Sequence, residues 1–255
     1  MLYRFRDLID QHLDELTLSV RTGNGKVWDE AQGDVPKARE AVEPACGIPS
    51  LMMGESLMDS SSGFDAVLYR EPLGVSVGIA PFDFPAMIPM GWMMSLCIAT
   101  GNTLVLKAAS MTPMTSIRML ELLYEAGLPK GVVNLVTCGR RETELLLTHP
   151  DVRGITFVGS TAIGLHVYST AAAHGKRVQA LREAKNHALV LQDAPLELTA
   201  AWPASTWASR CRSACFHSQV TSARSSAIFT HWARTASASS PSRSASPQPG
   251  STKRS

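Results

Sequence analysis

The chain has 255 residues, of which 45% are apolar and 18% are charged, and its formal net charge is +2. This composition is ordinary for a globular protein of one large domain or two small ones. A net charge so close to zero gives no argument by itself for a nucleic-acid or membrane partner. The charge is uneven, however, because no acidic residue follows Glu197.

The cysteines indicate free thiols. They are odd in number, and none has the paired spacing of a metal site, so we expect a reducing compartment and no bound metal. The opening residues, MLYRFRDLIDQHLDEL, contain acids and lack the apolar centre of a secretory signal. Together these features predict a cytoplasmic protein. The cysteines are Cys46, Cys97, Cys138, Cys211 and Cys215.

The first fifty residues predict two helices. Leu8, Ile9, Leu13 and Leu16 are spaced at helical intervals, which indicates one amphipathic helix over residues 2–20. A second helix is expected over residues 30–46, with both of its prolines near its ends because proline disrupts a helix interior.

From residue 65 onward, short apolar runs alternate with helical periods. The runs are rich in β-branched residues, as strands are. Repeated alternation of this kind predicts an α/β fold with a mostly parallel sheet and helices on both of its faces. The expected strands are 66–74, 75–81, 103–107, 132–136, 154–159 and 188–193, and the expected helices lie before residue 99, at 116–127, at 142–147 and after Ser160.

Residues 86–106 form an uncharged stretch that is long enough to be weighed as a membrane span. Pro89, Gly91, Gly101 and Asn102 interrupt it, and its last residues, TLVLK, have the pattern of a buried parallel strand. We therefore expect no membrane association.

The last part of the chain, residues 199–255, is dominated by Ser, Arg and Ala, contains no acids and has no sustained period. Such a composition predicts a disordered tail. It is also the composition that GC-rich coding DNA gives when it is read out of frame. A frameshift is thus a hypothesis that resequencing the locus would test.

Five segments in order over residues 1–198 resemble the aldehyde dehydrogenase superfamily. They are PLGVSVGIAPFDFPAMIPMGWMM, ATGNTLVLKAASMTP, LLYEAGLPKGVVNLV, HPDVRGITFVGSTAIG and GKRVQALREAKNHALVLQDA. The forms ACGIPSLMMGES, IAPFDFPAMIP and KRVQA followed by AKNH resemble the CoA-acylating methylmalonate-semialdehyde dehydrogenases in particular. Residues 1–198 would then be a partial Rossmann-like NAD-binding domain, incomplete at both ends.

The resemblance implies an NAD site at the carboxyl ends of the strands, where ligands bind in open α/β sheets. It places the backbone of Ala80 and Phe82 beside the cofactor and Lys107 at the adenosine ribose. Ser160, before a helix, would face the pyrophosphate. Without the resemblance, Lys107 would be a solvated charge at a strand end and Ser160 a plain helix cap. Ser110 stands where the family carries a glutamate, which weakens the expected hold on the ribose.

The sequence departs from the family at the reaction centre. The family nucleophile is a cysteine in a Gly-x-x-Cys loop, and none of the cysteines here matches it; Cys211 lacks the glycine. Asp83 replaces the asparagine whose amide helps to hold the oxyanion, a loss that typically costs about 3 kcal/mol. Arg182 and Glu183 add bulk to the neighbouring strand end. We therefore expect no turnover.

The function implied is NAD-dependent oxidation of malonate or methylmalonate semialdehyde with CoA as acyl acceptor. One alternative is a fragment of a non-acylating aldehyde dehydrogenase. Leu181 argues against this alternative, because it stands where those enzymes keep a glutamate that activates water. A second is a non-enzymatic nucleotide-binding or interaction module, but the basic residues of the tail are scattered, so we expect no nucleic-acid partner. The resemblance implies a homo-oligomer.

Overall fold

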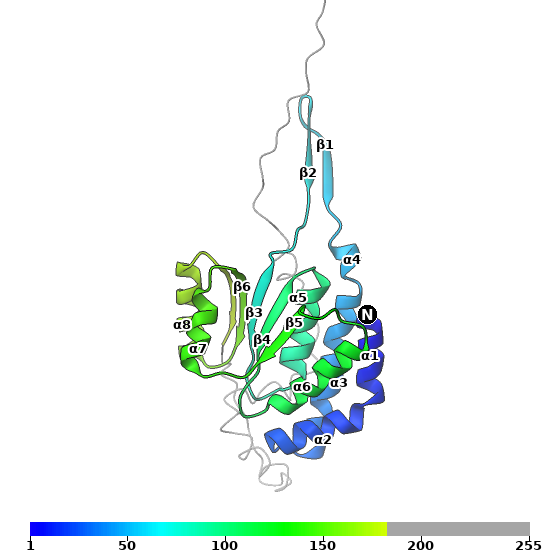
Figure 1. The fold of residues 1–255 in the computed structure, drawn as a ribbon. Coiled ribbons are helices and arrows are strands. Elements are labelled where there is room, and N and C mark those ends of the chain that lie inside the picture. The colour runs from blue at the N-terminus through cyan, green and yellow to red at the C-terminus, as the bar shows by residue number, and fades with distance from the viewer. Residues whose placement is uncertain (183–255) are drawn as a thin grey trace, which may run out of the picture.

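The computed structural model describes residues 1–182, which fold around one five-stranded parallel sheet with the strand order β5-β4-β3-β6-β7 (Figure 1). The strands are β3 (Val75–Ile79), β4 (Thr103–Lys107), β5 (Val133–Val136), β6 (Val152–Val158) and β7 (Arg177–Leu181). The central strand β3 is almost wholly buried, as its continuous apolar run predicts. The predicted α/β class and parallel pairing are confirmed.

Helices cover both faces of the sheet (Figure 1). On one face lie α1 (Leu2–Gln11), α2 (Leu13–Asn24), α3 (Trp28–Cys46), α4 (Ile48–Leu51), the π-helix η1 (Met87–Met94), α5 (Ser95–Ala99) and α6 (Pro113–Glu125). On the other face lie α7 (Arg140–Thr148) and α8 (Thr161–Ala173). Alternate residues of the strands explain this division, since Leu104 and Leu106 enter the first core, whereas Val77 and Ile79 enter the second.

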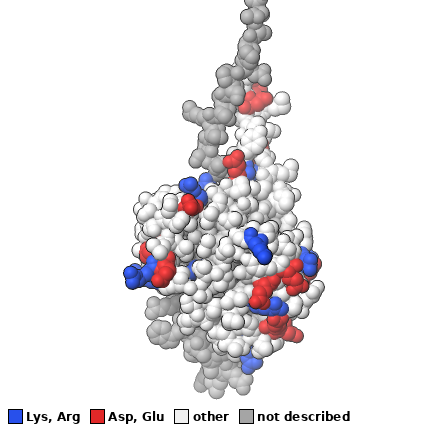
Figure 2. All heavy atoms as spheres, viewed as in Figure 1, with Lys and Arg blue, Asp and Glu red and all other residues white. Residues whose placement is uncertain are grey.

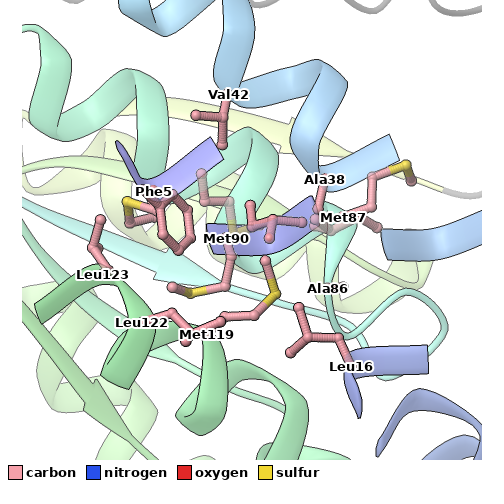
Figure 3. Packing of buried hydrophobic residues seen from close by; sticks show 14 of the residues in the cluster. Phe5, Leu16, Ala38, Val42, Ala86, Met87, Met90, Met119, Leu122 and Leu123 are labelled. Carbon is pink, nitrogen blue, oxygen red and sulfur yellow. The ribbon is translucent and has the colours of Figure 1, made fainter. Parts of the chain in front are cut away.

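The larger core is rich in methionine (Figure 3). Met90, Met94 and Met119 are completely buried beside Phe5. Methionine is unbranched and fills the irregular space between a π-helix and its α-helical neighbours, which a branched side chain would fit less well. Gly91 lets η1 approach α3, because a Cβ at this position would lie 2.9 Å from the Cα of Ala38.

Two expectations for the N-terminal helices are wrong. The single helix expected over residues 2–20 is two helices, α1 and α2, which meet at His12 with φ −107° and ψ 21°. Pro36 lies in the interior of α3 rather than near its end. A proline inside a helix costs about 3 kcal/mol. The buried face of α3, which includes Val35, Ala38 and Val42, offsets this cost by packing into the core.

The expectations for strands are partly wrong as well. Residues 66–74 were expected to form a strand, but only their first residues belong to β2 (Phe64–Leu68). This strand pairs antiparallel with β1 (Glu55–Ser61), which the sequence did not predict, in a hairpin that projects from the body (Figure 1). Strand β7 was also not predicted. The strand expected at 188–193 lies outside the described residues.

The uncharged stretch 86–106 folds into η1, α5 and β4, so it enters the core instead of forming one long helix. No helix within residues 1–182 is both long and apolar enough to cross a membrane.

Candidate functional site

The order in which the chain adds strands to the sheet changes between β3 and β6. The chain runs outward from β3 to β4 and β5, and then returns to the other side of β3 to form β6 and β7. Neighbouring strands whose connections leave in opposite directions make a topological switch point, the usual ligand position in open α/β sheets. The segments after β3 and β6, which start at Ala80 and Gly159, flank this point.

The strand ends bring two of the predicted site residues together. Ile79, the last residue of β3, pairs with Lys107, the last residue of β4. The N–H of the next residue, Ala80, donates a hydrogen bond to the carbonyl of Lys107 over 3.0 Å. The side chain of Lys107 is half-buried, while Ser110 is exposed in the turn before α6. Lys107 therefore stands at the sheet edge, and Ser110 stands outside it.

Ser160 lies where the sequence predicts, immediately before α8, and its carbonyl accepts a hydrogen bond from the N–H of Gly164 over 2.9 Å. Its hydroxyl does not cap the helix. A Cβ at Gly159 would lie 2.7 Å from the ring of Phe157, so only glycine fits here and no side chain covers the backbone before α8. The exposed hydroxyl and the first N–H groups of α8 are thus donors beside the switch point.

The loop after β3, residues 80–86, is held by polar side chains from other elements. The carbonyl of Phe82 accepts hydrogen bonds from Nδ2 of Asn24, over 2.7 Å, and from Oγ1 of Thr112, over 3.5 Å. The carbonyl of Pro85 accepts one from Oγ of Ser116, over 2.9 Å. The Phe82 carbonyl is therefore already hydrogen-bonded within the protein. The backbone contacts predicted for a ligand would have to come from the other N–H and carbonyl groups of the loop.

Two buried charges lie at the end of this loop. The Asp34 carboxylate accepts hydrogen bonds from the N–H of Met87, over 3.0 Å, and of Ala86, over 3.4 Å. Lys26 Nζ lies 3.9 Å from the same carboxylate and 4.1 Å from the centre of the Phe84 ring. Both side chains are buried. Burial raises the pKa of Asp34, while Lys26 and the two N–H donors act in the opposite direction.

Asp83 is half-buried in the loop, and its Oδ1 has no hydrogen-bond partner among residues 1–182. Burial raises the pKa of its carboxyl to about 6, and the positive charge of Lys26 partly opposes this rise. The side chain thus changes charge close to neutral pH. The sequence predicted a carboxylate here but gave no sign of Lys26 or Asp34, since both come from the N-terminal helices.

The remaining residues singled out in the sequence are placed as follows. Arg182 follows β7 and lies against α8, because a Cβ at Gly164 would be 2.7 Å from its Cγ. Of the three described cysteines, Cys97 is buried, whereas Cys46 and Cys138 are half-buried. Burial raises the pKa of the Cys97 thiol to about 12. Glu183 and Cys211 lie outside the described residues. No group of three potential metal ligands occurs in residues 1–182.

Comparison with known proteins gives a consistent result. The model of the aldehyde dehydrogenase family matches residues 1–227. Malonate-semialdehyde dehydrogenase 3 of Geobacillus kaustophilus is 49% identical over 198 residues, which are 78% of this chain and 41% of that protein. The chain thus spans about two fifths of the length of this curated relative.

Solved structures show the same relationship. The methylmalonate-semialdehyde dehydrogenase of Oceanimonas doudoroffii is 41% identical with a TM-score of 0.71, over 78% of this chain and 40% of that chain. A protein of Sinorhizobium meliloti 1021 that was assigned the same activity and solved with NAD gives the same identity, TM-score and coverage.

Proposed function

Because the chain belongs to the aldehyde dehydrogenase family, we propose that residues 1–182 form the NAD-binding part of a CoA-acylating semialdehyde dehydrogenase. The observation that carries the proposal is the pair of donors at the switch point. The Lys107 ammonium and the Ser160 hydroxyl stand at the ends of β4 and of β6, on either side of β3. Relatives of the chain are named malonate-semialdehyde and methylmalonate-semialdehyde dehydrogenases.

The chemistry of these donors fits a dinucleotide. An ammonium and a hydroxyl suit ribose hydroxyls and phosphate oxygens, and the N-terminus of a 13-residue helix favours negative charge. The residues that would hold NAD are Lys107, Ser160 and the backbone of Ala80 and Phe82, with Ser110 at the ribose. The bare backbone at Gly159 permits close approach. When bound, NAD accepts the hydride that leaves the aldehyde carbon.

The proposed substrate is malonate or methylmalonate semialdehyde, and the proposed acyl acceptor is CoA. Leu181 supports CoA over water, because it ends β7 at the position where hydrolytic relatives keep a glutamate. An aliphatic side chain cannot act as the general base that hydrolysis of a thioester requires. The same residue argues against the alternative of a hydrolytic aldehyde dehydrogenase fragment.

Calorimetry with NAD tests the proposed site. The 255-residue protein is expected to bind NAD weakly, because Ser110 offers no carboxylate to the ribose. Lys107→Ala removes a charged donor, so the dissociation constant is expected to rise about tenfold, as the loss of one charged hydrogen bond does. Lys130→Ala is the matched control, because Lys130 is exposed before β5, at the amino ends of the strands.

An unchanged dissociation constant in Lys107→Ala would exclude Lys107 from the site. Absence of NAD binding at millimolar concentration by the unmodified chain would exclude the site altogether.

A further inference from the structure

The π-helix η1 directly follows the 80–86 loop, and its first N–H groups need acceptors from outside the helix. The first N–H groups of any helix have no carbonyl partner within it. Ala86, which precedes η1, has no side chain that could accept a hydrogen bond, and both Ala86 and Met87 are buried. A buried N–H group without a partner costs free energy. The acceptor must therefore come from another element.

Asp34 of α3 supplies this acceptor. Its Oδ1 accepts a hydrogen bond from the N–H of Met87 over 3.0 Å, and its Oδ2 accepts one from the N–H of Ala86 over 3.4 Å. The side chain of Asp34 is completely buried. A carboxyl group keeps acceptor capacity in its ionised and in its protonated form, so the contact does not require a negative charge. Asp34 thus caps η1 from a distant part of the sequence.

The face of α3 that carries Asp34 packs against η1 along its length. Ala38 lies so close to Gly91 that a Cβ at Gly91 would be 2.9 Å from its Cα. The carbonyl of Ala41 accepts a hydrogen bond from Oγ of Ser95 over 3.5 Å. Asp34, Ala38 and Ala41 are spaced by four and three residues, so they lie on one face of the helix. This close packing holds Asp34 opposite the start of η1.

The start of η1 is also the end of the 80–86 loop. At the other end of the loop, the N–H of Ala80 donates to the carbonyl of Lys107 over 3.0 Å and continues the pairing of β3 with β4. Oγ of Ser116 donates to the carbonyl of Pro85, immediately before the residues that Asp34 contacts. Groups of the protein itself therefore fix both ends of the loop beside the switch point.

We propose that Asp34 is a positioning residue, whose carboxyl group caps η1 and so holds the 80–86 loop where it borders the proposed cofactor site. Asp34 acts through the backbone of the loop and does not touch the cofactor. The inference rests on the proposed function only in that this loop borders the proposed site. The hydrogen bonds themselves need no bound ligand.

The first test is amide hydrogen exchange of the 255-residue protein, followed by NMR without NAD. Asp34→Asn leaves one oxygen where the carboxyl group has two, so at least one of the two N–H groups loses its acceptor. Exchange at Ala86 or Met87 is therefore expected to become about tenfold faster, as the loss of one such hydrogen bond predicts.

Two controls separate local positioning from general stability. The N–H of Leu104 in β4 donates to the carbonyl of Val132 over 2.8 Å and reports opening of the whole sheet. Its exchange should change much less, because a merely structural role would accelerate all of these positions alike. Asp29→Asn is the matched variant, since Asp29 is an exposed carboxylate on the same helix. Unchanged exchange at Ala86 and Met87 in Asp34→Asn, or equal acceleration at Leu104, overturns the proposal.

A double variant covers the case in which Asp34→Asn does not fold. Lys26 Nζ lies 3.9 Å from the Asp34 carboxylate, so Asp34→Asn alone leaves a buried ammonium without its partner. Lys26→Met combined with Asp34→Asn removes both charges, and it should still accelerate exchange at Ala86 or Met87 relative to Lys26→Met alone. Equal rates in these two variants overturn the proposal.

Calorimetry then relates the contact to the cofactor. If the unmodified chain binds NAD, Asp34→Asn should raise the dissociation constant severalfold, whereas Asp29→Asn should leave it unchanged. An unchanged dissociation constant in Asp34→Asn, together with accelerated exchange, overturns the positioning role. If the unmodified chain does not bind NAD, the proposed function fails, and the exchange measurements still decide whether Asp34 holds the loop.

Discussion

At the scale of single residues, Asp83 is the loop carboxyl whose protonation depends most clearly on its surroundings. It is a half-buried carboxyl, one of its oxygens has no hydrogen-bond partner among residues 1–182, and the positive charge of Lys26 partly opposes the rise of its pKa. In water a carboxylate keeps its charge because solvent stabilises it. Here part of that solvation is lost, and the folded protein favours the protonated form up to about pH 6.

This shift predicts how Asp83→Asn changes stability with pH. The pKa in the folded state, about 6, lies above the ordinary value of 3.8, so the folded protein binds the proton more tightly than the unfolded chain. The contribution of Asp83 to the free energy of unfolding therefore decreases as the pH rises from about 4 to about 6 and is constant above that range. Asparagine does not titrate. Asp83→Asn should be more stable than the original by about 1–2 kcal/mol at pH 7.5, after allowance for solvent screening, and no more stable at pH 4.

Urea denaturation at the two pH values measures this difference. Glu125→Gln is a suitable control, because Glu125 is an exposed carboxylate on α6 that forms none of the ion pairs described above. A gain in Asp83→Asn that is equal at pH 4 and pH 7.5 would contradict the assigned titration.

At the scale of elements, a single lysine joins the start of β6 to the end of α8. Lys176 follows α8, and its Nζ donates hydrogen bonds to the carbonyls of His149 and Val152, the latter over 2.8 Å. The side chain is buried. These bonds tie the turn between α7 and β6 to the end of α8, and the His149 carbonyl also accepts a hydrogen bond from the N–H of Val152 over 3.1 Å.

Lys176→Met should lower the free energy of unfolding by about 2–3 kcal/mol, because it removes a buried charged donor that makes two hydrogen bonds. Lys130→Met, at an exposed position, should change it by less than about 0.5 kcal/mol. Urea denaturation followed by circular dichroism compares the two. Equal stabilities would show that water replaces the lysine in this turn.

The elements also explain what the sequence could predict. Strands β3, β4, β5 and β6 are predictable because each contains a short run rich in apolar and β-branched residues, which is typical of a buried parallel strand. Strand β7, RVQAL, is half-buried throughout and has no such run. The hairpin strand β1, ESLMDSS, is exposed throughout, so burial imposes no alternation on it. Pro36 could not be placed, because only tertiary packing outweighs its local cost.

Some residues of the candidate site could also be predicted from the sequence, whereas others could not. Lys107 and Ser160 are predictable, since strand ends and helix starts can be read from local patterns. Lys26 and Asp34 are not, because each acts through a contact with a residue more than fifty positions away. A turn sequence such as NGKV indicates where the chain bends but gives no information about which loop its lysine will face.

At the scale of the whole molecule, charges of both signs lie close together on the face shown in Figure 2, including the region of α1, α2 and α6. Arg118 of α6 pairs with Glu15 of α2 over 2.6 Å and with Glu121 over 3.0 Å. The first pair joins α6 to α2 and the second lies within α6, and each contributes less than about 1 kcal/mol at the surface. The helix layer is therefore held mainly by its apolar core.

We predict that the 255-residue protein produces no NADH from malonate or methylmalonate semialdehyde in the presence of CoA. A thiolate must attack the aldehyde carbon before hydride can leave, and no cysteine of the sequence follows a glycine by three positions. The buried Cys97, with a pKa of about 12, is a protonated thiol at neutral pH. Spectrophotometry should show no signal, while a relative such as the Geobacillus kaustophilus enzyme serves as the positive control.

Turnover by the unmodified protein that disappears in Cys211→Ala would contradict this prediction and identify Cys211 as the nucleophile. Turnover that survives this change would point to another thiol of the chain.

The hairpin of β1 and β2 has a consequence for how the sequence can vary. All of its residues are exposed, including Leu57, Met58 and Phe64. A two-stranded hairpin of this kind adds little to the stability of the body from which it projects. Substitutions in the hairpin should therefore change the free energy of unfolding very little. Changes at Leu57, Met58 or Phe64 would therefore alter the solubility of the protein before they altered its melting temperature, because these side chains form exposed apolar surface.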